Sequence, residues 1–190
     1  AFLMKKRFGE VKSYEDWCEP ALVANVMELL DAEIPKFKGK IETLHLCFTT
    51  DPFMYGYPEI QKTSMAILEK ANKAGIKCSV LTKGVLPLEL SLSKANEYGI
   101  TLVSLHEDFR QGMEPGSAPL EERLTSLKAL HENGCKTWVS IEPYPTPNII
   151  KQDLRELLDA VKFADKIIFG RTNYSKTISA YKEHREFYNK

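Results

Sequence analysis

Two kinds of segment alternate along the chain: short β-branched or apolar runs, and longer stretches in which apolar residues recur every three or four positions. The short runs predict strands over 43–50, 77–83, 101–106, 137–142 and 166–171. The longer stretches predict helices over 17–30, 59–74, 87–98, 120–132 and 153–163, with a final surface helix over 174–190. Gly75, Gly99 and Gly134 each follow one of these helices, where a left-handed residue commonly ends a helix.

Alternating strands and helices predict a parallel α/β sheet with right-handed crossovers. The strands are apolar almost throughout, as expected when both faces of a sheet are covered. Five strands are too few for a closed eight-stranded barrel. We therefore expect a partial barrel or a doubly wound sheet, in one domain that spans residues 1–190.

The composition is that of an ordinary globular domain. Hydrophobic residues make up 43% and charged residues 27%, and 26 Lys and Arg balance 26 Asp and Glu. This composition excludes disordered and fibrous proteins. No apolar run is long enough for a membrane span. A net charge of zero gives the chain no general attraction to nucleic acid. The four cysteines are widely spaced without a CxxC pair, which predicts reduced, mostly buried thiols in a cytoplasmic protein.

Polar residues follow or end all five predicted strands. Parallel α/β folds bind ligands at the carboxyl ends of their strands, so these residues are the candidate site. They are Thr49, Thr50, Asp51, Lys83, Ser104, Ser140, Glu142, Arg171 and Asn173. The hydroxyls can donate or accept, the lysine suits a carboxylate or phosphate, and the glutamate suits an ammonium or a ribose hydroxyl. This set favours a zwitterionic ligand that carries both an amine and a carboxylate.

Other features of the sequence are less specific. No Ser-His-Asp arrangement, P-loop or GxGxxG fingerprint follows any strand. His45 lies in the middle of the first predicted strand and is interpreted as a buried, satisfied histidine. The proline-rich loops 114–119 and 142–148 are expected to be stiff, and would either wall a pocket or turn the chain into the next helix.

Five short segments give the chain a likeness to a known family. They are LCFTTDP at 46–52, VLTK at 80–83, MEPG at 113–116, TWVSIEP at 137–143 and IFGRTNY at 168–174. In their order and spacing the chain resembles the radical S-adenosylmethionine (radical SAM) superfamily, in the branch similar to spore photoproduct lyase and DNA repair photolyase-like proteins. The resemblance covers nearly the whole chain. It implies a partial (β/α)6 barrel of parallel strands, TIM-barrel-like, that holds S-adenosylmethionine (SAM) and a [4Fe–4S] cluster.

The resemblance also implies an activity. Such enzymes reductively cleave SAM, with electrons from a reductant such as flavodoxin or ferredoxin, to a 5′-deoxyadenosyl radical that abstracts hydrogen from a substrate. The substrate here is unknown, with nucleic acid among the candidates. Carried over by position, residues 49–51 would line the methionine end of SAM, Lys83 and Ser104 would contact SAM, and Ser140 and Glu142 would lie near its ribose or methionyl group. Arg171 and Asn173 would complete the far wall or touch substrate.

The chain departs from the family in one respect, because it contains no CxxxCxxC loop to ligate the cluster. Residues 1–9 are similar to the stretch that follows the third cysteine of that loop. We therefore expect the first strand and the cluster loop to be absent from this chain, which would offer no metal ligands and be inactive alone. Cys47 lies one position from the hydrogen-donating cysteine of spore photoproduct lyase and is assigned no catalytic role, since such a shift reverses the face of a strand.

Two other functions are compatible with the sequence. The first is a non-catalytic nucleic-acid- or protein-binding module, suggested by the basic run 5–7 and by Tyr55 and Tyr57. The neutral charge weighs against it. The second is a metal-independent aldolase in which Lys83 forms a Schiff base. No neighbouring lysine or apolar pocket that would activate Lys83 is evident from the sequence.

Overall fold

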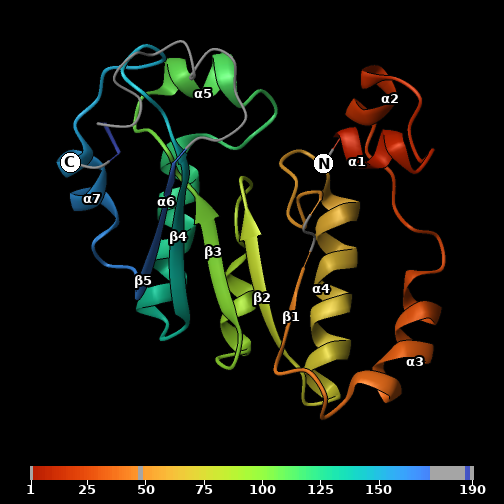
Figure 1. Cartoon of the computed structure of the whole chain (residues 1–190). Helices are drawn as coiled ribbons and strands as arrows, with labels where there is room; N and C mark the ends of the chain where they lie inside the picture. The colour runs from red at the N-terminus through yellow and green to blue at the C-terminus, as the bar shows by residue number, and fades with distance from the viewer. Residues whose placement is uncertain (1, 47–48, 172–186, 189–190) are drawn as a thin grey trace.

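The structure is a computed structural model that describes residues 2–46, 49–171 and 187–188 (Figure 1). The elements in chain order are α1 (Phe2–Arg7), α2 (Tyr14–Cys18), α3 (Val26–Phe37), β1 (Thr43–His45), α4 (Pro58–Lys73), β2 (Lys77–Thr82), the 3-10 helix η1 (Leu88–Leu92), β3 (Glu97–Thr101), α5 (Glu107–Met113), α6 (Leu120–Glu132), β4 (Lys136–Tyr144), α7 (Leu154–Val161) and β5 (Lys166–Arg171). Across these ranges, no helix combines the length and apolar character needed to cross a membrane.

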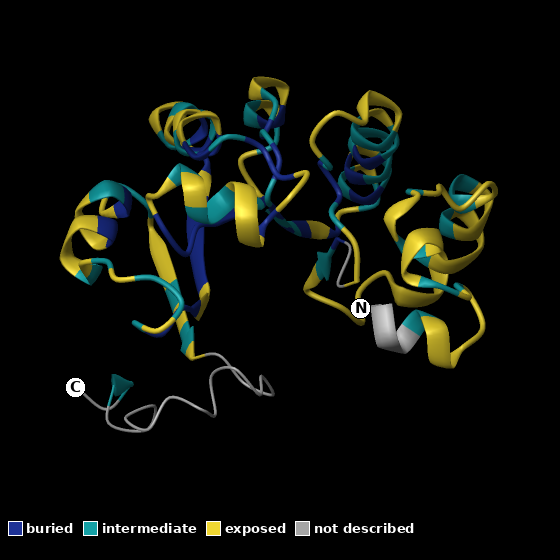
Figure 2. Cartoon of the chain, turned by 90° about the horizontal axis from the view of Figure 1, so that it is seen from above, coloured by how far each residue is buried: buried dark blue, intermediate teal, exposed yellow. Residues whose placement is uncertain are grey.

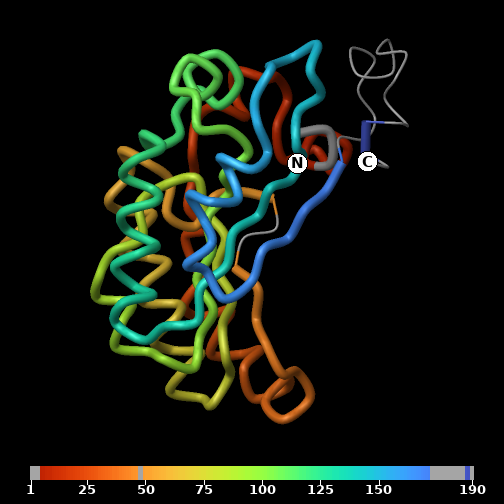
Figure 3. Tube along the Cα trace, turned by 90° about the vertical axis from the view of Figure 1, so that its left-hand side faces the viewer, coloured from red at the N-terminus to blue at the C-terminus, as the bar shows by residue number. Residues whose placement is uncertain are grey.

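The strands form one parallel sheet. Their order is β1-β2-β3-β4-β5, so each strand pairs with the next one along the chain. Figure 3 shows α4 and α6 together on one face of this sheet, and the contacts of α4 with β2 and of α6 with β3 and β4 agree with it. A sheet that adds strands in chain order with its crossovers on one face curves into part of a barrel. The half-barrel confirms the predicted partial (β/α) barrel.

The main hydrophobic core lies between the sheet and its helices. Successive strand residues point to opposite faces, and the set that includes Val80, Ile100 and Val139 is fully buried against the helices. From α6, Leu127 and Leu130 complete this layer and are also fully buried. Figure 2, seen from above, shows the buried residues between these elements. Burying each such side chain contributes about 1.5–3 kcal/mol to stability. The same alternation turns the other strand residues toward the opposite face of the sheet, which is the inner, concave face of the half-barrel.

Two helices begin and end where the sequence predicts. Pro58 is the first residue of α4, where its missing N–H costs no hydrogen bond. Gly75 follows that helix with φ of +80°, and Gly134 follows α6 with φ of +77°. Both glycines reverse the chain directly into the next strand, which keeps the helix-to-strand connections short and fixes where β2 and β4 begin.

The predicted helix over 17–30 is wrong. The chain forms α2, then leaves the helical conformation at Glu19, and starts α3 only at Val26. Pro20 explains the break, because its ring disfavours the helical conformation in the residue before it. Cys18, at the end of α2, is exposed, which corrects the expectation of buried cysteines at this position, whereas Cys78 and Cys135 are buried as expected.

The third strand also lies earlier than predicted. The segment 87–98 forms only the short η1, and β3 spans Glu97–Thr101 instead of 101–106. Tyr98 is fully buried, and its hydroxyl donates to the carbonyl oxygens of Leu90 and Ser93. Gly99 is therefore a strand residue and does not end a helix. The predicted final helix over 174–190 lies almost wholly outside the described residues, and Cys47 lies outside them too.

Candidate functional site

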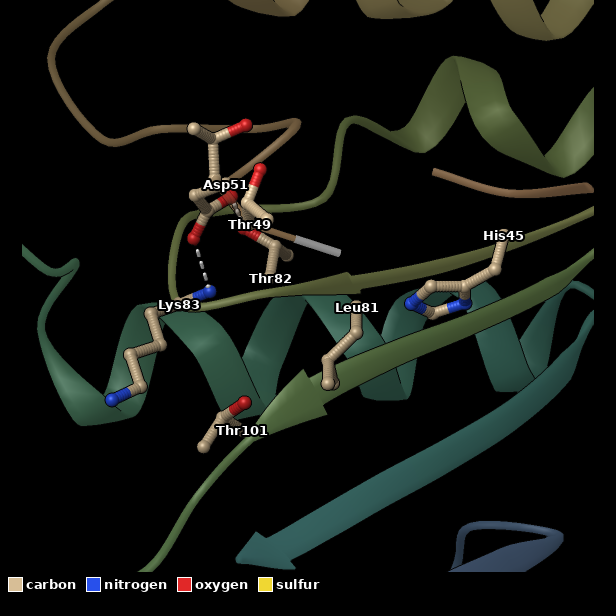
Figure 4. Close-up of a pocket in the computed structure, with 8 residues that line it drawn as sticks. His45, Thr49, Asp51, Leu81, Thr82, Lys83 and Thr101 are labelled. Atoms are coloured by element: carbon tan, nitrogen blue, oxygen red, sulfur yellow. Dashed lines mark hydrogen bonds between the residues drawn. The ribbon is translucent and has the colours of Figure 1, made fainter. Parts of the chain in front are cut away.

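A pocket of about 470 Å³ opens on the concave face, where β1, β2 and β3 end. It is lined by His45, Thr49, Thr50, Asp51, Leu81, Thr82, Lys83 and Thr101. Figure 4 shows Asp51 and Lys83 at one end of this pocket and His45 at the other. Four of the residues predicted from the sequence thus come together, namely Thr49, Thr50, Asp51 and Lys83.

Asp51 connects the ends of two strands. Its Oδ1 accepts hydrogen bonds from the Phe53 backbone N–H at 2.9 Å and the Thr82 hydroxyl at 2.5 Å. Its Oδ2 accepts one from the backbone N–H of Lys83 at 2.7 Å. An ionised carboxylate has about four acceptor positions, so these three bonds leave capacity for a ligand. Asp51 therefore both shapes the rim and keeps a negative charge at the pocket.

Lys83 brings a positive charge to the same pocket. Its side chain is 40% exposed, and its Nζ lies 2.8 Å from Oε1 of Glu114, which is only 6% exposed. The other oxygen of Glu114, Oε2, lies 3.0 Å from the guanidinium of Arg123. One buried carboxylate is thus shared between a lysine at the pocket and an arginine behind it. This group of three is called the Lys83–Glu114–Arg123 cluster below.

Arg123 is completely buried on α6. Its Nε donates to the carbonyl oxygen of Ala118 at 2.8 Å, and its Nη1 donates to that of Thr101 at 3.0 Å. Its Nη2 donates to the Ser117 hydroxyl at 2.8 Å. A buried charge is tolerated only when it is paired and hydrogen-bonded, and these contacts satisfy that condition. They also tie the 114–119 loop and the end of β3 to α6.

Sequence reasoning missed Glu114 and Arg123 as site residues. The sequence predicts that Glu114 lies in a stiff loop, and its local pattern gives no role to Arg123. A signal was present, because Arg123 lies three residues after Leu120 and four before Leu127, on the stripe that α6 buries. An arginine in such a stripe needs a buried acceptor, and Glu114 was available to supply it.

Two rings lie near the end of the pocket where His45 is found. Trp138 lies over Gly99 on the neighbouring strand, where an added Cβ would come within 2.4 Å of the indole. The Trp138 ring is 6.4 Å from that of His45. His45 is half-buried and lines the pocket, so the expectation that this histidine is buried is wrong. Desolvation by this partial burial lowers the pKa of His45, which favours a neutral imidazole.

Two further candidates, Ser104 and Ser140, lie along the same edge of the sheet but are not among the residues that line the pocket. Ser104 is buried beyond the end of β3, and its hydroxyl accepts a hydrogen bond from the His106 backbone N–H at 3.1 Å. Ser140 is buried on β4, in register with Thr101 and therefore next to the pocket lining.

Glu142 and Arg171 lie on the far side of this edge, on β4 and β5. Glu142 is exposed and lies against Gly170, where an added Cβ would come within 2.0 Å of its carboxylate. Arg171 is exposed at the end of β5, and Asn173 lies outside the described residues.

The donor set fits an amino-acid group better than it fits a metal. Asp51 and Lys83 present one carboxylate and one ammonium at the same end of the pocket, which complements a zwitterion. Within 2–46, 49–171 and 187–188, no three His, Cys, Asp or Glu side chains come together as metal ligands. Burial raises the pKa of the Cys78 thiol to about 11 and also raises that of Cys135. Neither thiol is therefore disposed to bind a cluster as thiolate.

Comparisons with known proteins agree with this fold. Among solved structures, that of SuiB from Streptococcus suis bound to S-adenosylmethionine superposes with a TM-score of 0.50 at 18% identity, covering 77% of this chain and 34% of that one. A likeness at this identity shows the fold alone.

Two curated proteins are related in sequence. Uncharacterized protein ORF301 of Acidianus two-tailed virus is 32% identical over 132 residues, covering 66% of this chain and 42% of the relative. Uncharacterized protein MJ0683 of Methanocaldococcus jannaschii is 34% identical over 86 residues, covering 43% of this chain and 33% of the relative. The chain thus spans less than half the length of either protein.

The family model of the radical SAM superfamily matches residues 17–161, which contain all of the described pocket and the whole Lys83–Glu114–Arg123 cluster. This match spans well over half of the chain. The half-barrel, the pocket at the carboxyl ends of its strands and this match lead to one conclusion: the chain belongs to the radical SAM superfamily.

Proposed function

We propose that this chain forms the SAM-binding half-barrel of a radical SAM enzyme, in the branch similar to spore photoproduct lyase. The observation that carries the proposal is that one anion, Asp51, and one cation, Lys83, line the same pocket in a member of this superfamily. With SAM bound there and a [4Fe–4S] cluster held by other residues of the protein, the two cofactors would together supply a 5′-deoxyadenosyl radical that abstracts hydrogen from a substrate.

The chain's own residues bind and orient the methionyl end of SAM. The Lys83 ammonium pairs with its carboxylate, and the acceptor position that remains on Asp51 receives its ammonium. The exposed hydroxyls of Thr49 and Thr50 lie at the same rim and can donate or accept. Ser104, Ser140 and Glu142 extend the polar edge toward the ribose. Holding SAM at both charged groups fixes the orientation of the rest of the molecule.

Other parts of the proposed enzyme lie beyond these residues. The described residues supply no set of cluster ligands. The cluster would therefore be held by cysteines elsewhere in the full-length protein. A reductant such as flavodoxin or ferredoxin would deliver the electron, in the cytoplasm. The substrate is unidentified, with nucleic acid among the candidates, and Arg171 and Asn173 are the residues proposed to face it.

The test is SAM binding to the full-length protein, prepared anaerobically with iron and sulfide. We expect the visible absorption of an iron–sulfur cluster, and SAM binding by calorimetry that weakens about tenfold or more in K83M. The matched control is K73M, which removes an exposed lysine from α4. A protein that binds neither iron nor SAM, or a K83M variant that binds SAM as tightly as K73M does, contradicts the proposal.

A further inference from the structure

The Lys83–Glu114–Arg123 cluster contains two positive charges and one negative charge. If Glu114 were paired with Lys83 alone, the two would form a neutral pair at the pocket and offer little attraction to an anion. Arg123 changes this balance, because it binds the second oxygen of the same carboxylate from the buried side. The cluster therefore keeps one net positive charge, and Lys83 is its only member at the pocket.

The two cations differ in access to solvent. Arg123 is fully buried, and its three nitrogens donate to Ala118, Thr101, Ser117 and Glu114, so it is occupied by the protein. Lys83 is 40% exposed, and Glu114 accounts for one of the three donors of its ammonium. An anionic ligand can thus reach only Lys83. Asp51 also lines the pocket, and its carboxylate accepts the backbone N–H of Lys83 and is not paired with the Lys83 ammonium.

We propose that Arg123 is a positioning residue that acts through Glu114: by compensating the Glu114 carboxylate, it leaves the charge of Lys83 available to an anionic group of the ligand. The inference rests on the proposed function, in which that anionic group is the carboxylate of SAM. Arg123 itself touches no ligand. It compensates the charge of Glu114 from the buried side of the cluster, where water does not screen the interaction between the two groups.

The test compares two ligands that differ only in this carboxylate. Dissociation constants for SAM and for decarboxylated SAM are measured by calorimetry in the anaerobically reconstituted full-length protein. Their ratio, decarboxylated SAM over SAM, reports the contribution of the carboxylate and cancels any general loss of folded protein. We expect a ratio of about ten in the wild type and about one in K83M.

Substitutions at the two buried partners, Arg123 and Glu114, should shift the ratio of dissociation constants in opposite directions. R123M makes the cluster neutral, and the ratio should fall about threefold or more, whereas R123K, which keeps the charge, should retain it. E114Q raises the cluster charge by one, and the ratio should rise about threefold. The double variant E114Q/R123M restores a single positive charge, and its ratio should return to the wild-type value. A purely structural role would change both dissociation constants together and leave the ratio unchanged.

The outcomes distinguish a failure of the role of Arg123 from a failure of the proposed function. A wild-type ratio of about one, or a ratio that K83M leaves unchanged, overturns the proposed placement of SAM. A ratio that falls in K83M but does not shift in opposite directions in R123M and E114Q overturns the role of Arg123 alone. If R123M does not fold, E114Q decides: a rise in its ratio supports the inference, and no change or a fall overturns it.

Discussion

The carboxylate of Asp51 holds the backbone of Lys83: Oδ2 of Asp51 accepts the Lys83 N–H at 2.7 Å across 32 residues of sequence. The same carboxylate accepts the Thr82 hydroxyl, so the loop after β1 is fastened to the end of β2. The negative charge of the pocket is thus positioned by the backbone of the residue that carries the positive charge. Changes at Asp51 should therefore affect stability and ligand binding together.

We expect Asp51→Asn to lower the free energy of unfolding by about 1–3 kcal/mol, because the amide group of asparagine would turn a donor toward at least one existing donor. SAM binding should weaken about tenfold or more, since the charge for the ammonium is lost. Urea denaturation and calorimetry measure the two effects. The control is Asp108→Asn, an exposed carboxylate near the same edge. Equal behaviour of the two variants would show that Asp51 is only a surface charge.

Gly84 lies directly after Lys83 and leaves no room for a side chain. A Cβ there would come within 1.8 Å of the carbonyl oxygen of Phe53, in a buried segment that cannot easily move. Gly84→Ala should therefore destabilise the protein by about 1–3 kcal/mol and disturb the Asp51 loop. Gly112→Ala is the control, because nothing lies within 4 Å of a Cβ at that position of α5. It should be neutral or slightly stabilising in thermal denaturation, and a similar loss in both variants would contradict the prediction.

Asp165 should make the stability of the β4–β5 region depend on pH. The backbone N–H of Thr137 donates to Asp165 at 2.7 Å and is the main cause that lowers the pKa of this carboxyl. A depressed pKa means that its stabilisation is complete above the ordinary aspartate value of about 3.9 and is lost as the pH falls through the folded-state value. Asp165→Asn should thus be less stable than wild type at neutral pH, and the difference should vanish in acid. Urea midpoints measured across this range test it, and a constant difference would count against it.

The described cysteines should differ in reactivity. Burial raises the pKa of Cys78 to about 11, so at neutral pH its thiol is protonated as well as inaccessible. Cys18 is exposed. Iodoacetamide should therefore modify Cys18 in the native protein and leave Cys78 and Cys135 until denaturant is added, as peptide mass spectrometry would reveal. Rapid native modification of Cys78 would mean that β2 opens more readily than its burial indicates.

Much of the fold follows from local sequence, because α4, α6 and the strands after them combine a clear apolar period with a glycine that ends the helix. The third strand could not be placed in this way. The local pattern predicts that a helix ends at Tyr98 and Gly99, whereas long-range contacts decide their conformation. The Tyr98 hydroxyl donates to the carbonyl oxygen of Leu90 in η1, and the indole of Trp138 covers Gly99. Local periodicity carries no information on such partners.

The candidate site, like the fold, can be predicted from the sequence only in part. Asp51 and Lys83 could be placed together because parallel strands bring their carboxyl ends to one edge, which is a property of topology. Glu114 and Arg123 could not, since their pairing depends on how α6 packs over the 114–119 loop. The position of His45 in the pocket likewise depends on which face of a short strand it occupies, and that face is set by the register of β1 against β2.

The indole of Trp138 lies across Gly99 and 6.4 Å from the ring of His45, which lines the pocket. Only a hydrogen atom fits between the β3 backbone and this indole, so any larger side chain at position 99 would displace the indole. The surroundings of His45 therefore depend on a glycine that is not itself among the residues lining the pocket.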